Sequence, residues 1–205
     1  MLTREFTSSL TRRATALAIA GAFVATPLAA QDYEPGVPRS AFEIRPYAGA
    51  FIPTGTQRDF LKDAVVAGVQ VSYSIIPQLA VTGTFGWSPS KDRITAGDQT
   101  LDVYQYDVGL EARAPQWYRA TSWDFTPFVG LGVGGRTYDY RDLDNVDAKT
   151  NVAGYLGVGG ELGLGRVGLR LEARDYVSRF EPLTGNGDTK TRNDVMVATG
   201  LTVRF

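Results

Sequence analysis

The 205-residue sequence contains no cysteine and no histidine. Without cysteine, a disulfide framework and thiolate chemistry are both excluded. Without histidine, the sequence lacks the commonest general base and the commonest metal ligand of proteins. The fold must therefore be held together in another way, and a closed backbone hydrogen-bond ladder would do so.

Excess charge of one sign and long apolar runs are also missing. The 21 basic and 22 acidic side chains nearly cancel, so nothing suggests a nucleic-acid partner. After the N-terminal region there is no run of about 20 apolar residues, and a membrane-spanning helix in the mature chain is not predicted. A membrane β-barrel would escape this test, because half of each of its strands is polar.

The first 30 residues have the composition of a secretory signal peptide. Several arginines precede the run of apolar and small residues Ala16–Ala25, and small residues then precede a predicted cleavage at Gln31. Residues 31–40 contain prolines and a glycine and predict a short periplasmic lead-in. The predicted outer-membrane β-barrel domain covers residues 41–205.

The last stretch, Asn193–Phe205, shows a period of two residues. Successive side chains of a strand point to opposite faces, so alternate residues share a face. The other row is small or polar, and the nearly apolar row comprises Val195, Val197, Thr199, Leu201, Val203 and Phe205. One apolar and one polar face over about 9–11 residues is the pattern of a strand in a membrane barrel.

Seven earlier segments show the same alternation. Their connections are long, tight, long, moderate, long, tight and long in chain order. This sorting of loops by end is typical of outer-membrane barrels, and a soluble sandwich has no reason to show it. The predicted fold is therefore all-β, an eight-stranded antiparallel up-and-down transmembrane β-barrel with both chain ends at the short-turn, periplasmic end. The seven segments are Ala41–Ile52, Ala64–Ile75, Leu79–Trp87, Thr100–Ala114, Trp123–Tyr138, Asn151–Leu164 and Val167–Val177.

Charged side chains fall on the polar row of these segments. The interior of an eight-stranded barrel is narrow enough for side chains to fill it, and unpaired charges there would be costly. We predict an ion-pair network in the lumen, formed by Glu43, Arg45, Asp107, Glu111, Arg113, Glu161, Arg170, Glu172, Arg174 and Arg204. A narrow conducting pathway is the alternative, because inward glycines leave room that either long Arg and Tyr side chains or water would fill: Gly130, Gly132, Gly134, Gly157, Gly159 and Gly163.

Aromatic residues of the apolar row are sorted by end as well. Trp123 and Phe205 fall at the short-turn end of the predicted barrel, and Trp87 and Tyr104 fall at the opposite end. Two interfacial girdles are the simplest explanation for this arrangement.

Two kinds of motif resemble ligand-binding sites but lack the structural context that binding requires. Gly130–Gly135 and Gly163–Gly168 match G-x-G-x-x-G but neither opens onto a predicted helix, so dinucleotide binding is not expected. The acidic cluster at residues 142–147 could hold calcium, but it lacks the glycine and terminal glutamate of an EF-hand loop, and a solvated acidic loop is the favoured interpretation. We expect no enzyme activity, no cofactor and no metal site.

The alternating segments, the sorted loops and the ending Leu201–Phe205 resemble the small eight-stranded outer-membrane β-barrels of the OmpA/OmpX type. The resemblance covers about residues 41–205 and implies a location in the bacterial outer membrane. It further implies that Phe205, with Val203 and Leu201, forms part of the signal read by the barrel-assembly machinery. Periplasmic chaperones would then be transient partners during biogenesis.

Four functions fit this architecture to different degrees. The favoured one is a non-enzymatic monomer, surrounded by outer-membrane lipid and lipopolysaccharide, that supports envelope integrity or makes surface contacts through its extracellular loops. A narrow porin-like channel for small solutes is the alternative. A lipid-modifying enzyme is disfavoured because the small-barrel enzymes with which it would be compared use histidine. A soluble lipocalin-type barrel is disfavoured because its apolar row would face inward.

Overall fold

The computed structural model describes residues 41–54, 62–91, 100–114, 118–119, 123–141, 148–180 and 190–205. The predicted signal peptide, the lead-in and the acidic cluster at 142–147 lie outside these residues. The strands are β1 (Phe42–Pro53), β2 (Ala64–Ile76), β3 (Leu79–Lys91), β4 (Thr100–Arg113), β5 (Tyr118–Arg119), β6 (Asp124–Tyr140), β7 (Lys149–Leu164), β8 (Val167–Phe180) and β9 (Lys190–Arg204).

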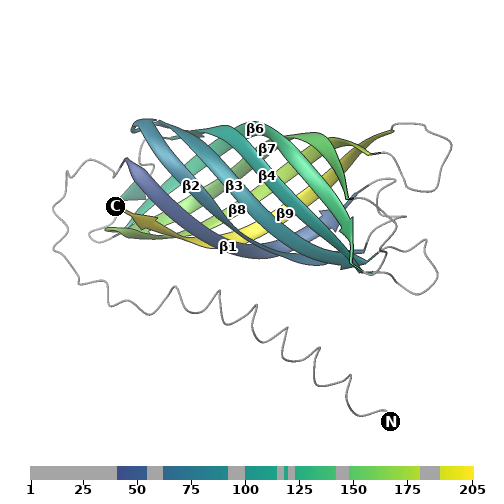
Figure 1. Ribbon diagram of the computed structural model, residues 1–205. Coiled ribbons are helices and arrows are strands. Elements are labelled where there is room, and N and C mark those ends of the chain that lie inside the picture. Colours follow the sequence, from purple (N-terminus) through teal and green to yellow (C-terminus); the bar gives the residue numbers. More distant parts are fainter. Residues whose placement is uncertain are drawn as a thin grey trace, which may run out of the picture. The chain divides into compact units, whose positions relative to one another are not determined.

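The long strands form one closed antiparallel sheet (Figure 1). Each pairs with its neighbour in the chain, β4 pairs directly with β6, and β1 closes the barrel against β9. The two-residue β5 only pairs with the first residues of β6. Among the described residues, eight strands therefore form the wall, which confirms the predicted eight-stranded antiparallel barrel.

Several strands are longer at the long-loop end than predicted. β3 continues to Lys91 instead of ending at Trp87, and β9 begins at Lys190 instead of Asn193. The polar residues that resemble a loop in the sequence extend the hydrogen-bond ladder here. For example, Ser88 pairs with Val103 and Lys91 pairs with Thr100 on β4.

Two local features follow directly from glycine and proline chemistry. Gly165 begins the two-residue turn between β7 and β8 with φ of 59°, in the left-handed region that glycine adopts without a steric penalty. In the pairing of β1 with β9, Ile44 opposes Val203 and Tyr47 opposes Gly200, with no paired residues between them. The interruption includes Pro46, which has no N–H to donate to the ladder.

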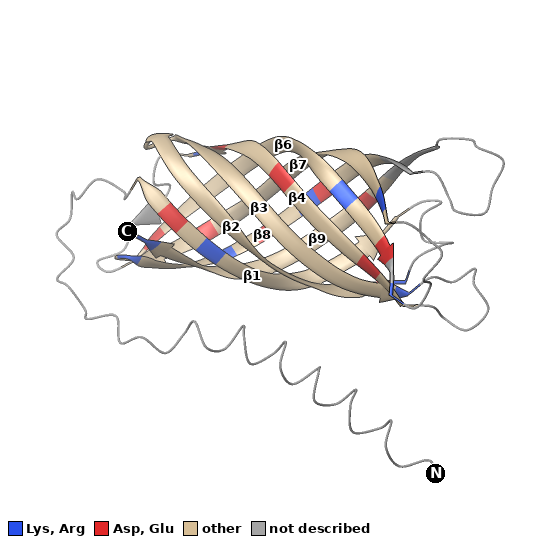
Figure 2. Ribbon diagram, in the orientation of Figure 1, with Lys and Arg blue, Asp and Glu red and all other residues tan. Residues whose placement is uncertain are grey.

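The apolar row faces outward and the charged row faces inward. Val152 and Val133 on the outer wall are 78% and 67% exposed, whereas Arg45 on the inner wall is 1% exposed. Figure 2 shows acidic and basic positions close together along the strands, on ribbons that are otherwise largely uncharged. A soluble barrel would have the opposite arrangement, so this wall suits an apolar solvent outside it. The part of the chain that the structure describes has no helix long and apolar enough to cross a membrane.

Candidate functional site: the interior of the barrel

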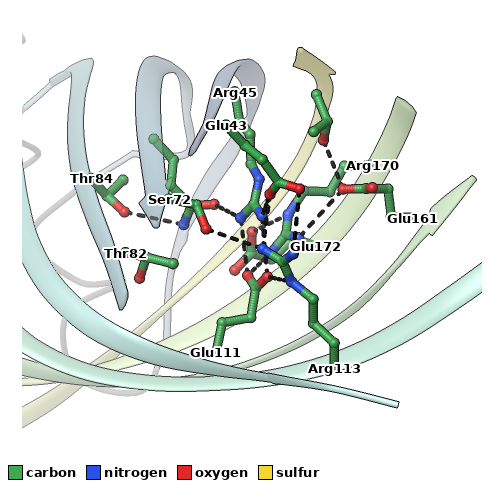
Figure 3. A network of polar contacts seen from close by, with 12 residues as sticks. Glu43, Arg45, Ser72, Thr82, Thr84, Glu111, Arg113, Glu161, Arg170 and Glu172 are labelled. Carbon is green, nitrogen blue, oxygen red and sulfur yellow. Dashed lines mark hydrogen bonds and ion pairs between the residues drawn. The ribbon is translucent and has the colours of Figure 1, made fainter. Parts of the chain in front are cut away.

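Ten buried charged side chains form one connected network inside the barrel, here called the ionic network. Figure 3 shows part of this network around Glu43, Glu111 and Arg170. The ten side chains lie on β1, β4, β7, β8 and β9, from the short-turn end to the middle of the barrel, where the inward row carries Arg, Glu and Asp in place of smaller residues. These are the ten residues expected from the sequence to share the lumen: Glu43, Arg45, Asp107, Glu111, Arg113, Glu161, Arg170, Glu172, Arg174 and Arg204.

Glu111 on β4 is the hub of the ionic network. Its carboxylate accepts from Arg45 at 3.1 Å, from Arg113 at 2.8 Å and from Arg170 at 2.5 Å. Each of these arginines is 6% exposed or less, so little water competes for the carboxylate. Charge-assisted bonds of this kind are the strong ones in proteins.

Glu43 on β1 is a second centre and ties the closing strands together. It forms ion pairs with Arg45, with Arg113 at 2.8 Å and with Arg204 at 3.4 Å. Arg204, on the last strand, also forms an ion pair with Glu161 on β7. The network therefore crosses the β1–β9 seam that closes the barrel.

The network continues towards the middle of the barrel through β8. Glu172 pairs with Arg170 at 3.1 Å and with Arg174 at 2.6 Å, and Arg174 pairs with Asp107 at 3.3 Å. The Tyr176 hydroxyl donates to the other Asp107 oxygen over 3.0 Å. Neutral side chains supply further contacts to the arginines, from Gln70 at 2.6 Å, Ser72 at 3.1 Å and Thr84 at 3.2 Å.

The ionic network is neutral, because its five arginines face two carboxylates on β4, one on β1, one on β7 and one on β8. A buried ion is tolerated when its charge and its hydrogen-bonding capacity are both matched nearby. Every carboxylate in the network touches at least one arginine. The carboxylates are therefore occupied as ion-pair partners.

A separate buried ion pair, Arg136 with Asp194, lies nearer the long-loop end. Both side chains are fully buried, and the Arg136 guanidinium lies 4.2 Å from the Tyr176 ring centre and 5.1 Å from the Phe51 ring centre. Sequence reasoning did not place this pair among the site residues. A signal was present, because Arg136 continues the inward row two positions beyond Gly134.

An apolar cluster fills the long-loop end of the interior, and the sequence analysis did not anticipate it. It packs inward residues near the loop-side ends of several strands against one another. The cluster contains Phe51, Val66, Leu101, Val103, Tyr138, Ala153, Tyr155, Tyr176, Met196 and Ala198. The interior thus has two layers, ionic towards the short turns and apolar towards the long loops.

Tyr155 occupies the space that inward glycines leave in the wall. A Cβ atom at Gly132 would lie 2.5 Å from the Tyr155 ring, and one at Gly109 would lie 2.2 Å from its hydroxyl oxygen. Tyr47 covers Gly86 in the same way, with its hydroxyl 2.5 Å from the position of a Cβ. Aromatic rings from the same wall, and not only long chains from the opposite wall, therefore use this space.

One small pocket lies beside the ionic network. A pocket between Tyr47, Arg170 and Met196 has a volume of about 10 Å³. A cavity must offer about 10–15 Å³ on this measure to hold one water molecule. The described part of the interior therefore resembles a packed core more than a pore.

The four predicted girdle residues lie at the two ends of the outer wall. At the long-loop end, Trp87 and Tyr104 oppose one another on β3 and β4, and the Trp87 indole donates to Asp102 over 2.9 Å. At the short-turn end, Trp123 is 38% exposed. Phe205 is 66% exposed there.

The predicted assembly-signal residues lie on the outward row of β9 and just beyond its end. Leu201 is 38% exposed and Val203 is partly covered. The Phe205 ring centre lies 6.1 Å from that of Phe42 at the start of β1, so the two chain segments meet at the short-turn end.

Comparisons with known proteins agree with this architecture. A sequence model of the outer membrane protein beta-barrel domain family matches residues 15–205. No curated protein sequence matches the chain.

Solved structures share the fold at low sequence identity. Neisserial surface protein A has a TM-score of 0.59 at 14% identity, over 81% of this chain and 98% of that one. OprG from Pseudomonas aeruginosa has 0.52 at 16%, over 82% and 97%. The N-terminal barrel of OprF from the same organism has 0.50 at 10%, over 82% and 98%.

Proposed function

Because the chain belongs to the outer membrane protein beta-barrel domain family, we propose that it acts without catalysis, as a sealed barrel that supports the bacterial envelope and presents its long loops for surface contacts. Its location in the bacterial outer membrane follows from the family. The finer role is inferred from how the interior is filled.

The observation that supports this role is the two-layer interior. The neutral ionic network occupies the short-turn half, and the apolar cluster with the Arg136–Asp194 pair occupies the long-loop half. A solute would have to break several charge-assisted contacts and then displace packed aromatic side chains. A wall braced in this way suits a mechanical role better than transport.

A recording in planar bilayers tests the sealed interior. The mature barrel, refolded and inserted at a defined density, is expected to give no stable conductance steps in potassium chloride. A parallel swelling assay with liposomes and small sugars is expected to show no uptake above protein-free liposomes. Stable steps together with sugar uptake would replace this proposal with the narrow porin-like channel.

The envelope role is tested in cells. Loss of the protein is expected to increase sensitivity to detergent and to large antibiotics that an intact outer membrane excludes, and re-expression of the wild-type chain should restore resistance. If resistance and surface adhesion are both unchanged by its loss, neither the envelope role nor the contact role stands.

A further inference from the structure

An apolar groove of about 570 Å³ crosses the outer wall over β2, β3, β4, β6 and β7. Its sides are outward residues, including Val69 on β2, Val133 on β6 and Val152 on β7. Its lining is dominated by apolar side chains, and Gly83 lies on its floor. The groove lies within the wall that faces membrane lipid, so it continues an established interface.

The groove is open at Gly83 because two neighbouring aromatic rings pack away from it. The Phe85 ring is stacked on Tyr104, with 6.4 Å between ring centres, towards the long-loop end. The Tyr106 ring lies over Gly135 on β6, since a Cβ there would be 2.6 Å from the ring. A Cβ at Gly83 would meet only a Val71 methyl group, at 3.4 Å. The opening therefore results from the packing of neighbouring side chains.

Hydroxyl groups border the groove on its long-loop side. The Tyr106 hydroxyl is 3.3 Å from the Thr137 hydroxyl, which is 2.7 Å from the Thr150 hydroxyl. These three groups cross β4, β6 and β7 and are named here the hydroxyl line. Beyond them, at the same end of the wall, Arg141 binds Asp102 with contacts of 2.7 and 2.9 Å.

Polarity along this part of the wall therefore rises in one direction, from the apolar groove through hydroxyls to an ion pair. An amphiphile with its acyl chain in the groove would place its linkage groups at the hydroxyl line and its head towards the long loops. In barrels of this class the long loops face the outside of the cell. The matching lipid is thus one of the outer leaflet.

We propose that the groove is a binding site for one acyl chain of a lipopolysaccharide molecule, with the ester or amide carbonyl at the root of that chain accepting hydrogen bonds from the hydroxyl line. In a bilayer, apolar contact alone gives no hydrophobic driving force, because the competing lipid tails are equally apolar. Selectivity then comes from close packing in the groove and from the hydroxyls. This site is independent of whether the barrel conducts.

Native mass spectrometry of the mature barrel, titrated in detergent with rough lipopolysaccharide, tests the proposal. Wild-type protein is expected to retain one lipopolysaccharide molecule. Gly83→Phe fills the groove and is expected to lower the apparent affinity about fivefold or more. Ala173→Phe on β8 is the control, because Ala173 lies on the outward row, is partly exposed, and neither lines the groove nor pairs with a residue that does.

A second variant removes two of the three hydroxyls of the hydroxyl line and nearly keeps the side-chain shapes. Thr137→Val with Thr150→Val is expected to weaken retention about threefold or more, while Thr199→Val, an outward threonine on β9, should leave it unchanged. Folding of every variant is verified by heat-modifiable migration on gels. Equal retention by Gly83→Phe and Ala173→Phe would overturn the site. Equal groove-dependent retention of phosphatidylglycerol would overturn the assignment to lipopolysaccharide.

Discussion

Glu111→Gln tests whether the interior charges act as one water-poor network. Glutamine keeps the shape of the side chain but removes its charge, so five buried arginines would face four carboxylates. Glu111 contacts three of those arginines, at 2.5, 2.8 and 3.1 Å. Removing one partner from a buried ion pair typically costs about 3–5 kcal/mol, because the other charge stays buried without compensation.

We expect Glu111→Gln to lower the free energy of unfolding by about 3–5 kcal/mol. Arg170→Met should have a similar effect, because Arg170 bonds to Glu111 and also pairs with Glu172. The double variant returns the network to four charges of each sign. Its loss should therefore be about 1–3 kcal/mol smaller than the sum of the two single losses, as expected for residues in one network.

The assay is urea or guanidinium unfolding of the mature barrel in lipid vesicles, followed by tryptophan fluorescence in both directions until the curves coincide. Arg141→Gln is the control, because it breaks an ion pair whose arginine side chain is 50% exposed, while the buried Asp102 keeps its hydrogen bond from the Trp87 indole. Exposed pairs contribute at most about 1 kcal/mol. If Glu111→Gln lowers the free energy of unfolding by no more than that amount, water solvates the interior charges and the proposal of a sealed interior is wrong.

Three further outcomes follow from the wall of the barrel. Gly86→Ala should cost about 1–3 kcal/mol, because its Cβ would lie 2.5 Å from the Tyr47 hydroxyl and 2.8 Å from the Gln105 side chain. Gly83→Ala on the same strand should change stability by less than about 0.5 kcal/mol, because its Cβ would make only an ordinary contact with Val71; equal losses in denaturant titration would contradict the packing. Because the chain has no native cysteine, single cysteines can carry spin labels, which should be accessible to membrane oxygen at Val197 and shielded from it at Ala198. The reverse pattern would show that the polar row faces outward and would contradict the orientation of the barrel wall. Phe205→Ala should reduce the amount of assembled barrel in cells while changing stability in vesicles by less than about 1 kcal/mol, since the ring is largely exposed; unchanged assembly in pulse-chase measurements would remove its role in the signal.

The architecture of this protein could be predicted because its signals are local. The alternation from Val195 to Phe205 identifies a strand and its two faces without any knowledge of its partners. The lengths of the connections then sort the ends of the barrel. The strand ends were less predictable, as at Lys91 and Lys190, because polar residues can continue a ladder when a neighbouring strand also continues.

The composition of the interior was only partly predictable. The alternation of inward and outward residues along each strand identified ten charged residues of the lumen. It did not reveal that Phe51, Leu101 and Met196 would meet in one apolar cluster. It also left open what fills the space beside the inward glycines. Tyr155 fills part of it from an adjacent strand, which depends on the inclination of the strands and on the rotamer of the ring.

The sequence by itself determined which face of each strand meets lipid and which is enclosed, because the two-residue period of a strand is a property of the local backbone. Only the tertiary structure decided which charges meet. Glu111 lies 66 positions from Arg45, and Glu43 lies 161 positions from Arg204. Contacts over such separations exist only after the barrel closes with one particular stagger of its strands, and no local pattern encodes that stagger.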